Sequence, residues 1–157
     1  MSTVADFRKD IVMLFREAFE AVPPGQNYTW FVQGKEGIFD ALATVTAEQA
    51  SRRHGPESNS IGAHLNHVRY FLFLFNADMS ADKSVEADWE GSWSKQVFTD
   101  EEWKQLAVDL KGEYQKALAW LEGDEEWPGK DGVIGGMVPL PHAAYHLGAV
   151  RALMKVG

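Results

Sequence analysis

Cysteine is absent from all 157 residues of this chain. Its absence excludes a disulfide framework, a thiolate metal site, a thiol nucleophile and an iron–sulfur cluster. Long apolar runs are missing too, since the longest, residues 70–75, is far too short to cross a bilayer. The N-terminal residues have neither the basic start nor the apolar stretch of a secretory signal peptide. We therefore expect a soluble, cytoplasmic protein that does not partner a membrane.

Positive charge is also scarce, because 15 Lys and Arg residues face 23 Asp and Glu residues, for a formal net charge of −8. A phosphate backbone would be repelled over most of such a surface, so nucleic acid is not an expected partner. Hydrophobic residues make up 45% and charged residues 24% of the chain, ordinary globular values that exclude wholesale disorder. At this length we expect a single domain, residues 1–157, with a core that needs no covalent staple.

Sustained strand-like alternation is a further absence, whereas apolar residues recur at three- and four-residue steps along most of the chain. This periodicity predicts long helices over residues 4–22, 60–77, 99–122 and 139–156, with shorter helical pieces between 38 and 53. Ser60 is the expected N-cap of one long helix, and Thr99 opens a capping box at the start of the next. The expected fold class is all-α, a four-helix bundle with long inter-helix connections.

Three connections are expected to be irregular: residues 25–37, 79–98 and 123–136. We expect the aromatic residues of the first to tuck that loop onto the body, and those of the second to pin a long connection in the same way. The aromatic residues in question are Tyr28, Trp30 and Phe31 in the first connection and Trp89, Trp93 and Phe98 in the second. Trp89, Trp93 and Trp127 are also candidates for the mouth of a pocket.

Histidines carry the only catalytic or ligating chemistry that the residues suggest. Four of the five lie in predicted helices as two close pairs, His64 with His67 and His142 with His146. Residues four apart share a helix face, so His142 and His146 can grip one metal ion from one side. The fifth, His54, lies in a Gly/Pro loop, and we expect it to be solvated.

A third imidazole from the 60–77 helix would complete a facial set of three. Such a set leaves a metal position open for water or substrate, as catalytic sites do and structural sites do not. His64 falls nearer the middle of the apolar stripe, whereas His67 heads a stripe of its own, and periodicity does not choose between them. The alternative is that these are core histidines bonded to backbone carbonyls, because His-x-x-x-His is common by chance. No Glu-x-x-His motif supports a di-iron carboxylate site.

Two motifs in this order resemble the DinB/YfiT-like superfamily of metalloenzymes. Residues 60–67, Ser-Ile-Gly-Ala-His-Leu-Asn-His, are similar to the start of that family's second helix. Residues 142–150, His-Ala-Ala-Tyr-His-Leu-Gly-Ala-Val, are similar to its last-helix signature, and residues 37–51 fit its usual run-up. The resemblance implies a four-helix bundle, often a homodimer, in which three histidines hold a divalent metal such as zinc or nickel.

Carried over residue by residue, the resemblance makes His67, His142 and His146 the metal ligands. Further candidates for supporting the site or contacting a small-molecule substrate are His64, Tyr145 and Arg151. Known members of the family include S-transferases that use bacillithiol or mycothiol and a thiol-using maleylpyruvate isomerase. The resemblance therefore implies a metal-dependent transferase or hydrolase with a low-molecular-weight thiol as cosubstrate, which must supply any thiolate. The alternative is a non-catalytic bundle that binds a metal or a small molecule, for example as a stress-response accessory.

Overall fold

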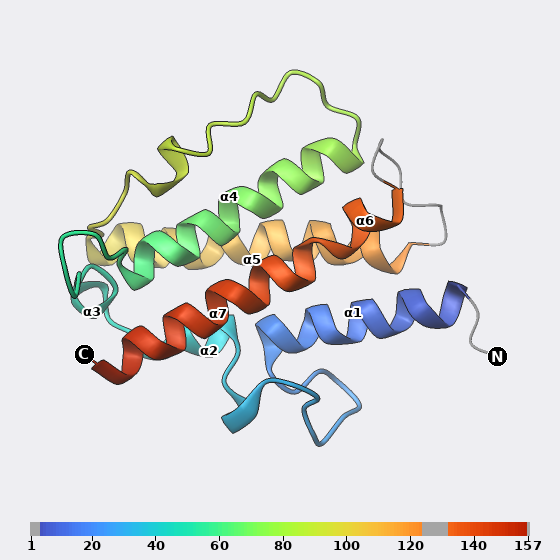
Figure 1. Ribbon diagram of the computed structural model, residues 1–157, viewed down its shortest axis with the longest axis horizontal. Helices are drawn as coiled ribbons and strands as arrows, with labels where there is room; N and C mark the ends of the chain where they lie inside the picture. Colours follow the sequence, from blue (N-terminus) through green and yellow to red (C-terminus); the bar gives the residue numbers. More distant parts are fainter. Residues whose placement is uncertain (1–3, 124–131, 157) are drawn as a thin grey trace.

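The computed structural model describes residues 4–123 and 132–156, and all regular structure within those ranges is helical (Figure 1). The long helices are α1 (Val4–Glu20), α4 (Ile61–Met79), α5 (Asp100–Glu122) and α7 (Pro139–Val156). The connections contain α2 (Ile38–Thr44), α3 (Ala47–Ala50), α6 (Gly132–Met137) and the 3-10 turns η1 (Gln33–Lys35) and η2 (Gly91–Trp93). The predicted all-α class is therefore confirmed. None of the described helices combines the length and the hydropathy that crossing a membrane requires.

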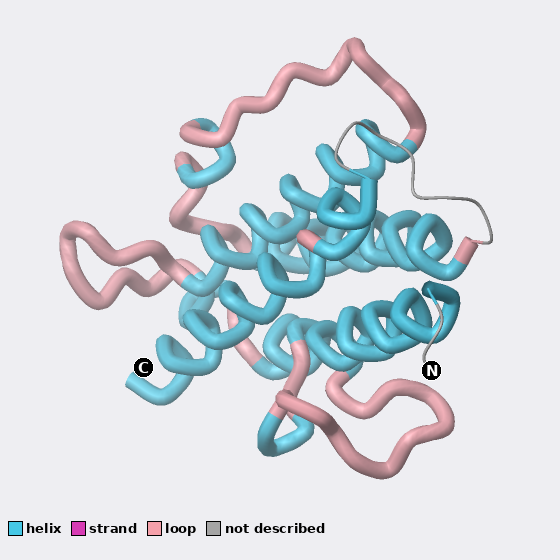
Figure 2. Tube along the Cα trace, turned by 45° about the vertical axis from the view of Figure 1, so that its right-hand side comes forward, coloured by secondary structure: helices cyan, strands magenta, loops and turns pink. Residues whose placement is uncertain are grey.

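The long helices pack in a closed ring of contacts, in which α4 and α1 each contact both α5 and α7. Figures 1 and 2 show them running alongside one another, with the connection between α4 and α5 arching over the outside of α4. The core lies inside the ring and is built from fully buried side chains such as Phe15, Leu65, Leu110 and Leu121. Each side chain of this size stabilises the fold by about 1.5–3 kcal/mol on burial.

The helix starts that the sequence predicted are confirmed at atomic detail. Ser60 Oγ accepts a hydrogen bond from the backbone N–H three residues further on. Thr46 with Gln49 and Thr99 with Glu102 form complete capping boxes, in which each side chain bonds the backbone of the other residue. A cap of this kind satisfies a backbone donor that the helix leaves unpaired, which stabilises the fold by about 1 kcal/mol.

The first connection differs from the sequence prediction, because its aromatic side chains face solvent. Tyr28 and Phe31 are exposed and Trp30 is 61% exposed. The loop is held instead through its backbone: the fully buried carboxylate of Glu17 accepts hydrogen bonds from the N–H groups of Trp30, Phe31 and Val32, at 2.7, 2.6 and 2.8 Å. A carboxylate that binds three consecutive N–H groups fixes the course of the chain and leaves the neighbouring side chains free to point outward.

The last connection is also more regular than the sequence prediction had it. Residues 132–136, predicted to be irregular, form all but the last residue of α6 (Gly132–Met137). This helix has six residues, three of them glycine, and is too short for an apolar period to be read from it. Residues 124–131, with the pocket candidate Trp127, lie outside the described ranges. The sequence allowed the last long helix to start near Pro139 or Pro141, and it begins at Pro139, a residue that a first turn tolerates.

Candidate metal centre

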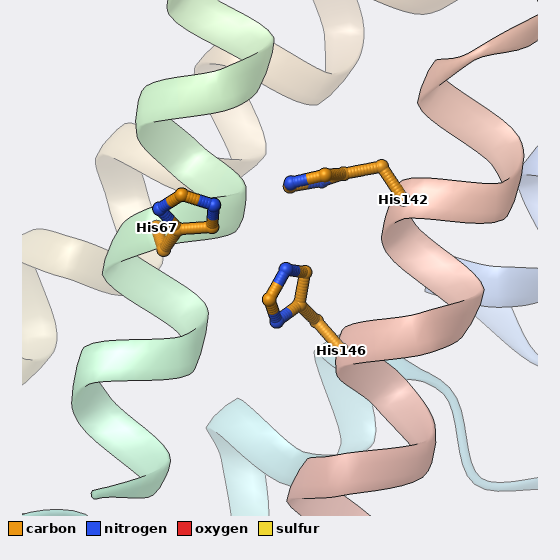
Figure 3. Close-up of side chains that lie close together, drawn as sticks. All are labelled: His67, His142 and His146. Atoms are coloured by element: carbon orange, nitrogen blue, oxygen red, sulfur yellow. The ribbon is translucent and has the colours of Figure 1, made fainter. Parts of the chain in front are cut away.

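Three of the predicted site residues meet where α4 packs against α7. His67 comes from α4, and His142 and His146 come from successive turns of α7 (Figure 3). One ring nitrogen of each residue lies within 4.8 Å of those of the other two, an arrangement that could hold a metal ion. Figure 3 shows a nitrogen of each ring directed at the other rings. We refer to His67, His142 and His146 as the three-histidine cluster.

Aromatic side chains cover the cluster from two sides. Phe71 stacks on the His142 ring at a centroid distance of 3.8 Å, and Trp93 stacks on the His67 ring at 4.0 Å. His67 is 7% exposed and His146 is 3% exposed, while His142 is half-buried. The imidazoles therefore lie in a largely apolar environment, in which any charge they carried would be poorly solvated.

This environment lowers the pKa of every histidine in the cluster. Burial is the main cause, and repulsion among neighbouring imidazoles adds to it. The pKa falls to about 4 for His67 and His142 and to about 3 for His146. All three rings are therefore neutral near pH 7, and a neutral imidazole has the free lone pair that a metal ion requires.

His67 has a hydrogen-bond partner in the connection between α4 and α5. Its Nδ1 lies 2.7 Å from the Oγ of Ser92, a buried residue of η2. The same Oγ donates a hydrogen bond to the carbonyl oxygen of Trp89 at 2.6 Å. Nothing in the sequence singled out Ser92, because it sits in a polar connection 25 residues from the histidine that it contacts. Trp93, predicted to line a pocket mouth, lies directly beside it.

His64 lies beside the cluster, one turn before His67. Its Nδ1 is 3.0 Å from the Nδ1 of His146, so one of these nitrogens donates a hydrogen bond and the other accepts it. Burial lowers the pKa of His64 as well. Both histidines of α4 thus reach α7, because residues three apart lie on neighbouring parts of one helix face. His64 contacts His146 of the cluster, whereas a ring nitrogen of His67 lies within 4.8 Å of ring nitrogens of both His142 and His146.

The remaining predicted site residues lie at different distances from the cluster. The Tyr145 ring is 73% exposed and packs edge-on to the His146 ring at 5.0 Å. Arg151 lies nine residues after His142, half a turn around α7 from it, and its nearest carboxylate is that of Glu36 at 3.9 Å. Tyr145 therefore borders the cluster, whereas Arg151 faces the loop before α2.

One buried polar atom of the cluster is left without a hydrogen bond by the described residues. The Nδ1 of His142 is buried and has no partner among them. Buried polar atoms are nearly always paired, and an exception calls for an explanation such as a function or an ion.

Comparison with protein families, with curated proteins and with solved structures finds no match for this chain.

Proposed function

We propose that this protein is a divalent-metal-dependent enzyme of the DinB/YfiT-like kind, with His67, His142 and His146 as the metal ligands. The observation that carries the proposal is the convergence of three neutral ring nitrogens within 4.8 Å from two separate helices. The ring of four long helices and the two histidine motifs support the resemblance to that superfamily. The homodimer that the resemblance implies stays a prediction.

The donor set fits zinc or nickel better than magnesium or calcium. Imidazole nitrogen suits zinc and nickel, whereas magnesium and calcium prefer carboxylate, carbonyl and water oxygens. Three protein ligands leave one position of a four-coordinate ion for water or substrate. The aromatic cover of Phe71 and Trp93 limits the access of bulk water to the rings, which strengthens electrostatic interactions at the site.

A divalent ion bound here would lower the pKa of a water molecule or a thiol toward neutrality, which produces a nucleophile at physiological pH. Because the chain contains no cysteine, a thiolate could come only from a cosubstrate. Ser92 and His64 contact the Nδ1 atoms of His67 and His146, and the exposed side chain of Tyr145 packs beside the His146 ring. These roles favour a transferase or hydrolase that acts on a small molecule.

A second candidate function is a metal-stabilised bundle without turnover. The observation that favours it is the position of His64, whose Nδ1 lies 3.0 Å from a member of the cluster. If His64 supplied a fourth nitrogen, the coordination of the ion would be complete, as in structural zinc sites. The number of histidines that hold the ion therefore separates the two candidates.

Elemental analysis of purified protein after reconstitution with zinc tests the site. We expect about one ion per chain in the unmodified protein and almost none in His142→Ala, because two remaining imidazoles bind a divalent ion weakly. His54→Ala is the matched control, since this exposed histidine lies outside the cluster. Near-zero metal in the unmodified protein, or equal metal in His142→Ala, would refute the site.

The ranking of the two α4 histidines tests whether a coordination position is open. His67→Ala should lose more metal than His64→Ala. The reverse ranking would refute the assignment of His67, and equal losses would favour the four-ligand structural alternative. In cobalt-substituted protein, adding bacillithiol or mycothiol should then produce a thiolate-to-cobalt absorption band. A spectrum unchanged by both thiols would exclude these two thiols as cosubstrates that bind the metal.

A further inference from the structure

We propose that Ser92 is a positioning residue, which holds His67 in the tautomer whose Nε2 lone pair faces His142 and His146. The tautomer is a property of the metal-free protein, whereas its consequence for metal affinity rests on the proposed function. Ser92 lies in the long connection between α4 and α5, so this connection helps to shape the site.

The hydrogen bonds around Ser92 determine where the proton of His67 lies. A serine hydroxyl has one proton to donate, and Ser92 Oγ donates it to the carbonyl oxygen of Trp89 at 2.6 Å. The carbonyl cannot donate in return. Towards His67 Nδ1, 2.7 Å away, Ser92 Oγ therefore acts as an acceptor, and Nδ1 must carry the hydrogen. A neutral imidazole has a single N–H, so the Nε2 of His67 is left with its lone pair.

That lone pair points toward the rest of the cluster. Figure 3 shows the two nitrogens of His67 on opposite sides of the ring, one of them directed at His142. Because Nδ1 is occupied by Ser92, the nitrogen that faces the cluster is Nε2. No hydrogen bond from any described residue reaches it. The geometry thus presents a free lone pair at the place where a metal ion would need one.

Ser92 is itself held firmly against α4. It is buried, and its carbonyl oxygen accepts a hydrogen bond from Asn66 Nδ2 at 3.2 Å. The next residue, Trp93, stacks on the His67 ring, and its carbonyl oxygen accepts a hydrogen bond from Gln96 Nε2 at 2.8 Å. Gln96 is tied in turn to Ser60, the N-cap of α4. The connection is therefore fixed to the same helix that carries His67.

Loss of the Ser92 hydroxyl would free the proton of His67 to move to Nε2. A ring protonated there cannot ligate a metal ion through that nitrogen. Removing a hydrogen-bond partner that orients a ligating histidine typically weakens metal affinity by about 10–100-fold. We expect a loss of this size in Ser92→Ala.

Nitrogen NMR of ¹⁵N-histidine-labelled, metal-free protein tests the tautomer directly. The His67 signals, identified by their absence from His67→Ala, should show a protonated Nδ1 and an unprotonated Nε2. In Ser92→Ala the same ring should shift toward protonation at Nε2. An unmodified protein with the hydrogen on Nε2 of His67 would overturn the inference, and this measurement holds even if Ser92→Ala fails to fold.

Zinc affinity, measured by competition with a chromophoric chelator, tests the consequence. Ser94→Ala is the matched control, because Ser94 lies just after η2 and its hydroxyl also bonds a backbone carbonyl, that of Gly91 at 2.7 Å, without touching a histidine. We expect 10–100-fold weaker binding in Ser92→Ala and no change in Ser94→Ala. Unchanged tautomer and affinity in Ser92→Ala would overturn the role of Ser92. If no variant binds zinc but the tautomer is as expected, the metal site fails and the Ser92 inference stands.

Discussion

Glu17 and the three-histidine cluster are both buried and polar, yet they find their partners in different ways. The Glu17 carboxylate accepts hydrogen bonds from three consecutive backbone N–H groups, those of residues 30–32. In the cluster a ring nitrogen of each histidine lies within 4.8 Å of those of the other two, and the buried Nδ1 of His142 has no hydrogen-bond partner among the described residues. The carboxylate is fully paired with backbone N–H groups, whereas the cluster contains a buried ring nitrogen without a partner.

This difference distinguishes a buried group that serves the fold from one that serves a ligand. A satisfied buried carboxylate stabilises the chain that wraps it, and removing it leaves several donors unpaired. A buried polar atom without a partner costs stability, and such costs persist in proteins mainly where function requires them. The comparison therefore predicts opposite responses when the two regions are altered.

The largest effect expected of any substitution is that of Glu17→Ala. The substitution leaves the three N–H groups of residues 30–32 without their acceptor, so the free energy of unfolding should fall by about 3–5 kcal/mol. Chemical denaturation measures the change. Glu48→Ala, at a position where the side chain is 88% exposed, is the control and should change stability by no more than about 0.5 kcal/mol. Equal stability of the two variants would show that Glu17 does not hold the loop.

The second expected effect is a loss of stability of the metal-free protein as the pH falls below about 6.5. In the unfolded chain histidines protonate near that pH, whereas folding lowers the pKa of His67 and His142 to about 4 and that of His146 to about 3. Below about pH 6.5 the unfolded state thus binds more protons. The free energy of unfolding should fall by up to about 1.4 kcal/mol per pH unit for each of these residues, with no contribution above that range.

Denaturation curves between about pH 7.5 and 5, before most carboxylates titrate, measure this dependence. His54→Ala should keep the full slope, because His54 is exposed and lies outside the cluster. A stability that does not change over this interval would mean that the cluster is better solvated than its burial indicates.

The smallest expected effect has the opposite sign to that of Glu17→Ala. In metal-free protein His142→Phe removes a buried Nδ1 that lacks a partner and keeps a ring stacked on Phe71. Stability should therefore stay the same or rise by about 1 kcal/mol, while zinc binding is lost. Thermal unfolding without metal and with zinc measures both. A loss of more than about 1 kcal/mol without metal would make His142 a packing residue.

Local signals account for the parts of the fold that could be predicted from the sequence. The caps at Ser60 and Thr99 and the apolar period of the long helices depend on residues within one or two turns of each other, and these predictions were confirmed. The exposed aromatics of residues 28–31 were predicted wrongly, because Glu17 lies more than a dozen residues away and acts on the backbone rather than on side chains. The helix over 132–137 was missed because it is too short to show a period.

The candidate site also has features that follow from local spacing and features that depend on how distant segments pack. The pairing of His142 with His146 on one helix face follows from their spacing alone. Periodicity did not choose between His64 and His67, and the structure explains why, since both reach α7 but at different places. Ser92 could not be found from the sequence, because only the course of the connection brings it to His67.

The sequence by itself determined a helical class, a shared face for two imidazoles and the absence of any thiolate, because period, spacing and composition are properties of the chain. The tertiary structure alone decided which ring nitrogens converge, which hydroxyl contacts His67 and which histidine of α7 contacts His64. Those outcomes depend on how α4 lies against α7, across sequence separations as large as 82 residues. A contact between residues so far apart in the sequence depends on how whole helices pack. The residues of a short segment do not determine that packing.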